Sequence, residues 1–266
     1  MTFAVAGGGR VSASFVSRLP HLAAELGPVA AQSYRLASRI VNSIGAGHAV
    51  REYAELNDSP LILICAPSSV VAPIVSALAD SIECSGKTIL LCNDGADSGY
   101  LAPLQLRGAS VASIHLIPGF EKRFVGEGDR SAIREARKLV KKLGGRLEEI
   151  NTNKVAVYSA GLSFGIGLFT ALMEASMQCF LDAGMSKASA VKVVETIFQS
   201  SLRAYIYAGK RSWSGPLAHG DSVAMEREIE SLEATKPLLA RHYRETAAFA
   251  REILSGSNAN GNVTSS

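Results

Sequence analysis

Short runs of apolar residues, each about the length of one strand, recur through the first 150 residues. The clearest are Leu61–Cys65 and Thr88–Cys92, in which apolar and polar residues do not alternate. Such runs are typical of parallel strands that are buried on both faces of a sheet. Helix-like segments separate them, and this rhythm predicts a doubly wound parallel α/β domain of the Rossmann type over residues 1–150. The other expected strands are 2–6, 29–33, 110–116, 123–126 and 146–150, and the expected helices include 36–44 and 130–143.

The character of the chain changes after residue 150, where strand-like runs stop and long helical patterns begin. The expected helices are 153–183, 186–208, 221–235 and 237–254. Residues 151–254 are therefore predicted to form an all-α domain, and the family resemblance given below implies that this domain serves substrate binding and dimerisation. The last residues, 255–266, are almost all Ser, Gly, Asn and Thr, and we expect this tail to be disordered.

The composition is that of a globular protein, with 47% apolar and 19% charged residues among 266. The net charge of +3 comes without a dense basic run, which argues against a dedicated nucleic-acid-binding protein. Four cysteines show no CxxC pairing, and no basic segment opens the chain. We expect a cytoplasmic protein that binds no metal ion, nucleic acid or membrane.

Residues 155–173 carry no charge, and this length can nominate a transmembrane helix. A helix that is apolar all round can equally be buried in the core of a helical domain or in a subunit interface. Several hydroxyl groups and glycines interrupt the run, so the buried interpretation is favoured over the membrane one.

A glycine-rich turn, Gly7-Gly8-Gly9-Arg10-Val11-Ser12, follows the first expected strand. It matches the pattern G-x-G-x-x-(G/A) at its first two glycines, with Ser12 in the third small-residue place. Bare backbone there lets a pyrophosphate reach the N-terminus of the following helix. An ordinary tight turn has the same composition, but the position at the first β–α junction favours dinucleotide binding.

The segment after the second expected strand predicts which dinucleotide binds. NAD sites usually place a carboxylate there to accept a hydrogen bond from the ribose 2′-hydroxyl. This sequence has no acidic residue between Glu25 and Glu52, and it has Ser33, Tyr34 and Arg35 at that point. A hydroxyl and a guanidinium suit a 2′-phosphate, so NADP is predicted; the alternative is that Arg35 is only a solvated helix-start residue.

Three residues are candidates for chemistry. His115 ends an apolar strand, where the carboxyl edge of a doubly wound sheet faces the ligand crevice, and it can donate a proton or bind substrate. Lys154 and Tyr158 are spaced to share one helix face, where they can polarise a carbonyl and supply a proton. The alternatives are a structural histidine bonded to loop backbone, a snorkelling lysine and a packed tyrosine.

These features together resemble the 6-phosphogluconate dehydrogenase-like superfamily, in particular its poorly characterised Rossmann-like branch with a C-terminal helical domain of unknown function. The resemblance covers the chain to about residue 254. It rests on Val5–Val11, Leu61–Pro67, Ser113–His115, Gly119-Phe120 and, most specifically, Ser214–Asp221. The last segment is similar to the T-G-P-x-x-R-G-D signature of the branch.

The resemblance implies an NADP-dependent oxidoreductase that acts on a small carbonyl, imine or hydroxy-acid substrate and dimerises through its C-terminal helices. Related β-hydroxyacid dehydrogenases place a catalytic lysine near the position of Lys154. The implied cofactor residues are Gly7, Gly8, Gly9, Arg10 and Val11 at the pyrophosphate, Ser33, Tyr34 and Arg35 at the 2′-phosphate, Ala66, Pro67 and Ser68 along the cofactor, and Asn93 near the nicotinamide ribose.

The sequence also departs from the family pattern. His219 replaces the arginine of the signature, Ser159 stands where the branch commonly has histidine, and Ile166-Gly167 stands where it commonly has Ser-Asn. Tyr158 occupies the place of the asparagine of the β-hydroxyacid enzymes. Two explanations stay open: the substrate is different and less polar, or catalysis is weakened. The alternative function is therefore a non-catalytic NADP-binding regulatory dimer.

Overall fold

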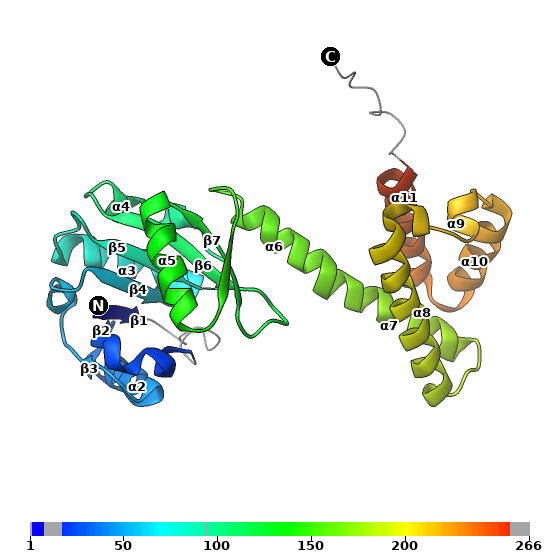
Figure 1. Cartoon of the computed structure of the whole chain (residues 1–266). Coiled ribbons are helices and arrows are strands. Elements are labelled where there is room, and N and C mark those ends of the chain that lie inside the picture. Colours follow the sequence, from blue (N-terminus) through cyan, green and yellow to red (C-terminus); the bar gives the residue numbers. More distant parts are fainter. Residues whose placement is uncertain (1, 8–17, 94, 256–266) are drawn as a thin grey trace, which may run out of the picture. The chain divides into compact units, whose positions relative to one another are not determined.

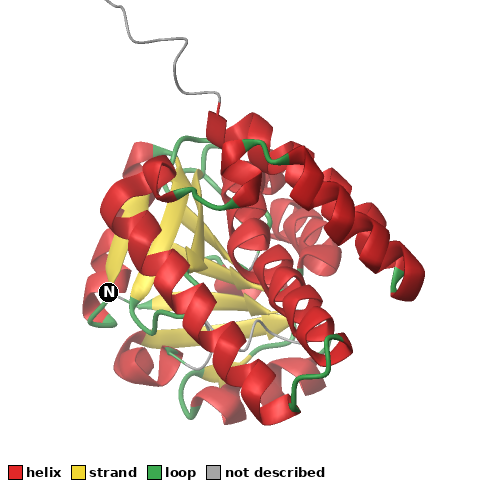
Figure 2. Ribbon diagram, turned by 90° about the vertical axis from the view of Figure 1, so that its right-hand side faces the viewer, coloured by secondary structure: helices red, strands yellow, loops and turns green. Residues whose placement is uncertain are grey.

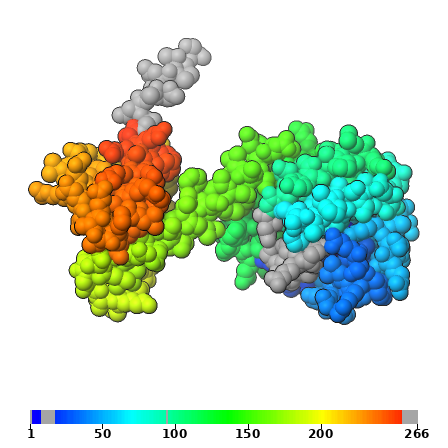
Figure 3. Space-filling view, turned by 180° about the vertical axis from the view of Figure 1, so that it is seen from behind, coloured from blue at the N-terminus to red at the C-terminus, as the bar shows by residue number. Residues whose placement is uncertain are grey.

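The computed structural model describes residues 2–7, 18–93 and 95–255, and these residues form two compact units (Figures 1 and 3). The first unit is Met1–Ser163 and the second is Phe164–Ser266. All the strands of the described residues belong to the first unit.

The first unit is built on an eight-stranded sheet in the order β3-β2-β1-β4-β5-β6-β7-β8. Figure 2 shows these strands in yellow as a twisted sheet flanked by helices. Neighbouring strands are parallel except for β6 and β7, which are antiparallel. The strands are β1 (Phe3–Gly7), β2 (Leu26–Ala31), β3 (His48–Ala49), β4 (Leu61–Cys65), β5 (Thr88–Cys92), β6 (Ser110–Leu116), β7 (Arg123–Gly128) and β8 (Arg146–Glu149).

Two apolar cores lie on the two faces of this sheet. Leu63 of β4 belongs to the core that includes residues of helices α2 and α5, whereas Ile62 and Ile64 belong to the core that includes residues of α3 and α4. Successive side chains of one strand thus enter opposite cores, which is why the central strands are continuous apolar runs. The helical elements of this unit are η1 (Leu19–Glu25), α2 (Tyr34–Ile44), η2 (Tyr53–Leu56), α3 (Ser68–Ser81), η3 (Ser98–Leu101), α4 (Ala102–Gln105), α5 (Arg130–Lys142) and α6 (Val155–Ser163).

The second unit is entirely helical in its described part. Side-chain caps fix two of the helix starts: Ser186 accepts a hydrogen bond from the Ser189 amide at 3.2 Å, and Asp221 accepts one from the Ala224 amide at 3.0 Å. The elements are a π-helical turn η4 (Phe164–Leu168), α7 (Phe169–Asp182), α8 (Lys187–Ala208), η5 (Gly209–Ser212), α9 (Pro216–His219), α10 (Ser222–Thr235) and α11 (Pro237–Ser255).

The predicted α/β fold with a helical C-terminal region is confirmed, and two differences from the prediction concern the second strand and the extent of the first unit. The second strand is Leu26–Ala31 and not 29–33, because Ser33 instead caps α2 by accepting a hydrogen bond from the Leu36 amide at 3.3 Å. The first unit extends past residue 150 to Ser163, so it includes α6, whose Val155 is buried. The predicted tail, 255–266, lies outside the described residues except for Ser255, which ends α11.

The uncharged stretch lies in one helical run, Val155–Asp182, formed by α6, η4 and α7. This run has a mean hydropathy of 1.7 in its most apolar window and is long and apolar enough to cross a membrane. Only 6% of that window is buried within the single chain. The run is therefore not the buried core of a single chain, and its burial in a subunit interface stays a prediction.

Candidate active site

The carboxyl ends of β1, β2 and β4 lie side by side at one edge of the sheet. The last residue of β1, Gly7, pairs with Ala31 of β2 on one side and with Cys65 of β4 on the other. The chain order reverses here, because β2 and β3 extend the sheet in one direction and β4 to β8 in the other. Such a reversal point is where doubly wound sheets bind ligands, outside the carboxyl ends of the strands.

Gly7 is held at this point by close packing against α2. A Cβ atom at Gly7 would lie 2.3 Å from Cδ1 of Ile40, which is itself buried. Glycine therefore lets the helix that follows β2 approach β1 closely. The rest of the predicted glycine turn, which includes Gly8, Gly9, Arg10, Val11 and Ser12, lies outside the described residues.

The edge beyond β2 carries hydroxyl and cationic groups. Ser33, Tyr34 and Arg35 are exposed at the start of α2, with Ser33 as its N-cap. The Arg51 guanidinium lies over the Tyr34 ring, 4.8 Å from its centroid, and adds a second cation that was not predicted from the sequence. The Glu55 carboxylate nearby accepts hydrogen bonds from the amides of Glu52 and Arg51, which lower its pKa.

The turns after β4 and β5 are linked to each other. Ser68 begins α3 after Ala66 and Pro67, and its hydroxyl accepts a hydrogen bond from Nδ2 of Asn93 at 3.3 Å. Oδ1 of Asn93 accepts hydrogen bonds from the amides of Gly95 at 3.0 Å and Ala96 at 2.9 Å. The buried Asn93 side chain therefore holds these two turns together at the carboxyl edge.

His115 is buried in β6, and both of its ring nitrogens are hydrogen-bonded. Nδ1 lies 2.6 Å from the Asn93 carbonyl oxygen, and Nε2 lies 3.0 Å from the Ser113 hydroxyl. The bond from Nδ1 is one that a structural histidine makes to loop backbone, and a chemical role for His115 stays a prediction. Ser113 in turn pairs with Glu127 of β7 in the antiparallel register, which brings a carboxylate next to this histidine.

Glu127 is a fully buried carboxylate in the same cluster. Its Oε1 accepts hydrogen bonds from the Ser113 hydroxyl at 2.6 Å and the Ser98 amide at 2.7 Å. Its Oε2 accepts hydrogen bonds from the Ser98 hydroxyl at 2.9 Å and the Asn153 amide at 3.4 Å. Asn153 has a φ of 64°, in the left-handed region, and it directly precedes Lys154. Glu127 thus links β6 and η3 to the turn that begins α6.

Lys154 and Tyr158 are joined by the first turn of α6, in which the Tyr158 amide donates to the Lys154 carbonyl oxygen at 2.9 Å. Lys154 is exposed. The Tyr158 hydroxyl is buried and has no hydrogen-bond partner among the described residues. Burial also raises the pKa of this phenol, so at neutral pH it stays protonated and can donate a hydrogen bond.

The Ser214–Asp221 signature forms a connector between helices. Gly215 precedes the short helix α9, and its carbonyl oxygen lies 2.8 Å from Nδ1 of His219. Gly220 ends that helix with a φ of 70°, and Asp221 caps α10. These bonds give His219 and Asp221 structural roles in the connector.

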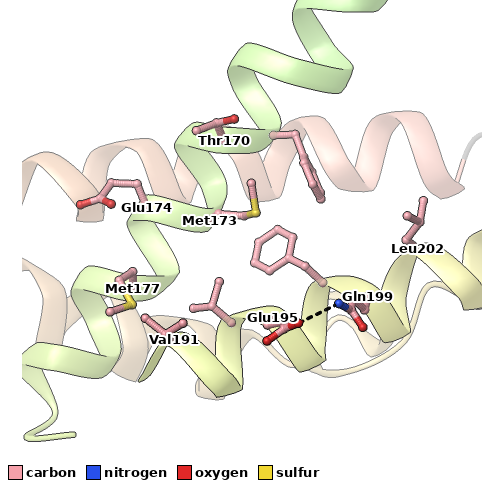
Figure 4. Close-up of a pocket in the computed structure, with 11 residues that line it drawn as sticks. Thr170, Met173, Glu174, Met177, Val191, Glu195, Gln199 and Leu202 are labelled. Carbon is pink, nitrogen blue, oxygen red and sulfur yellow. Dashed lines mark hydrogen bonds between the residues drawn. The ribbon is translucent and has the colours of Figure 1, made fainter. Parts of the chain in front are cut away.

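The second unit has an apolar groove between α7 and α8 with a volume of about 510 Å³ (Figure 4). Met173 and Met177 of α7 and Val191 and Leu202 of α8 line it. Glu195 is also in its lining, where it accepts a hydrogen bond from Gln199 at 3.1 Å. Groups of His, Cys, Asp and Glu that could hold a metal ion are absent from the described residues.

Comparison with known proteins connects this fold to known structures. The family model described as Domain of unknown function (DUF2520) matches residues 123–249, just under half of the chain. This segment carries β7, β8 and most of the helices that come after them. The match places a domain of unknown function over the C-terminal part of the chain, as the resemblance implies. No curated protein matches the sequence.

Solved structures share the whole architecture. A protein from Thermotoga maritima is 17% identical with a TM-score of 0.66, over 94% of this chain and 98% of that one. An imine reductase from Pseudomonas sp. is 21% identical with a TM-score of 0.62, over 95% and 94%. An imine reductase from Myxococcus stipitatus, in complex with NADP+, is 12% identical with a TM-score of 0.65, over 96% and 93%. At these identities the likeness shows the fold.

Ser113, Glu127 and Arg51 were not predicted as site residues from the sequence. Ser113 and His115 lie two apart in β6, which puts both on one face of the sheet, so the Ser-x-His spacing was a usable signal. Glu127 gave a weaker signal, because its position opposite Ser113 depends on the antiparallel register of β7.

Proposed function

We propose that the chain is an NADP-dependent oxidoreductase that transfers hydride between NADP(H) and a small carbonyl, imine or hydroxy-acid substrate. The observation that carries this proposal is the reversal of strand order beside Gly7, together with the polar groups at the same carboxyl edge. Similar solved structures support it, because they include an imine reductase in complex with NADP+ and a variant in complex with NAD+.

The residues at the edge fit a nicotinamide dinucleotide with a 2′-phosphate. Ser33 and Arg35 are exposed beyond β2, Arg51 adds a guanidinium next to Tyr34, and no carboxylate stands in the sequence between Glu25 and Glu52. These donors match a dianion better than they match a ribose hydroxyl. Ala66, Pro67 and Ser68 would lie along the cofactor and Asn93 near the nicotinamide ribose, while the pyrophosphate would bind at the Gly7–Val11 turn.

When bound, the reduced nicotinamide supplies the hydride. The residues of the chain then have to orient the acceptor and supply a proton to its nitrogen or oxygen. Tyr158 suits this role because its buried hydroxyl is protonated and has no partner in the described structure. Lys154, one helical turn earlier, would stabilise negative charge at the same atom. His115 would assist from the end of β6.

The experiment that tests this proposal measures NADPH oxidation over a panel of cyclic imines, ketones and keto acids. We expect turnover by the natural chain, and Lys154→Met to lower kcat about 10²- to 10⁴-fold while NADPH still binds. Lys187→Met is the matched control, because Lys187 is an exposed lysine at the start of α8. Cofactor binding without turnover on any substrate would favour the non-catalytic regulatory dimer instead.

We also propose that the chain forms a homodimer through its helical unit. Phe164, Ile166 and Leu168 are each more than half exposed, and the apolar groove between α7 and α8 is open at the surface. Exposed apolar surface on this scale marks an interaction site when it forms a patch. A second copy of the chain supplies matching apolar helices and would cover the run Val155–Asp182.

A further inference from the structure

Glu127 stands out because it is a fully buried carboxylate without a cationic partner within salt-bridge distance in the described part of the chain. Its neighbours are instead the hydroxyl of Ser113, the amide and hydroxyl of Ser98, and the amide of Asn153. A buried charge is costly unless it is paired or fully hydrogen-bonded. Each of these groups can donate a hydrogen bond to the carboxylate, and the two amides can only donate.

The hydrogen atoms in this cluster can be counted. The Asn93 carbonyl oxygen can only accept, so Nδ1 of His115, 2.6 Å away, carries a hydrogen. The Ser113 hydroxyl has one hydrogen, and it lies between Oε1 of Glu127 at 2.6 Å and Nε2 of His115 at 3.0 Å. If Ser113 donates to Glu127, Nε2 must donate to Ser113, and the imidazole is doubly protonated.

In the other arrangement, one proton lies on Glu127 and not on Nε2 of His115. If Ser113 donates to Nε2, the proton must reside on Glu127, which then donates to Ser113. In both arrangements His115 and Glu127 together hold one proton more than a neutral imidazole and a carboxylate. Because the amides of Ser98 and Asn153 also donate to Glu127, the first arrangement, with an imidazolium and a carboxylate, is the favoured one.

We propose that Glu127 is a positioning residue that acts through Ser113 to keep His115 in its doubly protonated form. The consequence of this inference rests on the proposed function. A fixed positive charge at the carboxyl end of β6 stabilises the negative charge that develops on a substrate oxygen or nitrogen as hydride arrives. The same carboxylate binds the Asn153 amide, so it also fixes the turn that carries Lys154.

The test is NMR of the full-length protein with ¹⁵N-labelled histidine, with a His115→Gln variant to identify the signals. In the natural chain we expect both nitrogens of His115 to be protonated at neutral pH. In Glu127→Gln the side-chain amide donates to Ser113, which then donates to Nε2, so the pKa of His115 should fall by about 1–3 units. Equal titration of His115 in the two proteins would overturn the proposal.

Two further variants keep the test decisive if Glu127→Gln does not fold. Glu127→Asp retains the charge and should retain the imidazolium, whereas Ser113→Ala removes the bridge and should lower the pKa of His115. Ser110→Ala is the matched control, because it removes a serine hydrogen bond to Ser131 at the other end of β6 and should leave His115 unchanged. These spectra need neither cofactor nor substrate, so failure here is distinct from failure to bind NADPH.

Discussion

Gly7 shows how one residue couples the predicted cofactor site to the packing of the sheet. A methyl group there would overlap Cδ1 of Ile40, so Gly7→Ala should lower the free energy of unfolding by about 1–3 kcal/mol. Ile40→Val removes that atom and alone should cost about 0.5–1.5 kcal/mol. Denaturant unfolding of the single and double variants should show that the two costs do not add. If the two losses of stability add, Cδ1 of Ile40 is not what excludes a side chain at Gly7. Gly95→Ala is the control, because a Cβ atom there meets nothing within 4 Å.

The position of a single residue was predictable from sequence where helix capping or the burial of a central strand requires that residue type. The N-cap residues Ser186 and Asp221 and the buried strand cysteines Cys65 and Cys92 meet these requirements. Glu127 was not predictable, because nothing near it in sequence indicates that it is buried. Its role depends on pairing with Ser113 across an antiparallel turn, which is a tertiary fact.

At the scale of elements, the N-terminus of α2 is where cofactor preference should be set. Ser33→Asp keeps a capping side chain and adds a carboxylate that repels a 2′-phosphate and accepts from a ribose 2′-hydroxyl. We expect the ratio of NADPH to NADH affinity to fall about tenfold or more, measured by calorimetric titration of both cofactors. Ser33→Ala is the control: it should cost about 1 kcal/mol of stability through loss of the cap, without a gain for NADH. An unchanged ratio in Ser33→Asp would remove this segment from the cofactor site.

Helices and strands were predictable from sequence where their pattern of apolar residues fits only one type of secondary structure. The strands Leu61–Cys65 and Thr88–Cys92 have the expected ends, because two-sided burial requires continuous apolar runs. Helix α3 was not anticipated, since it contains Pro73 and is apolar on more than one side. The π-helical turn Phe164–Leu168 also has no sequence signal of its own, although it contains the Ile166-Gly167 departure from the family pattern.

At the scale of the whole molecule, exposed apolar surface on the helical unit predicts self-association. Leu202, in the groove, is 55% exposed, and Leu202→Glu should convert a dimer to a monomer in sedimentation equilibrium without unfolding the chain. Val223→Glu is the matched control, because Val223 is 62% exposed on α10 and does not line the groove. A natural chain that is monomeric, or that stays in solution only with detergent, would contradict the dimer, and the second result would favour the membrane interpretation of Val155–Asp182.

The central claim, that the carboxyl edge beside Gly7 binds NADP, is tested most directly by thermal unfolding with NADPH, with NADH and with neither. A ligand that binds only the folded chain stabilises it by about 2.7 kcal/mol at a hundredfold excess over Kd. We predict a clear rise in Tm with NADPH and a smaller rise with NADH. An unchanged Tm with both cofactors would mean that the glycine segment is an ordinary turn, and it would contradict the proposed oxidoreductase.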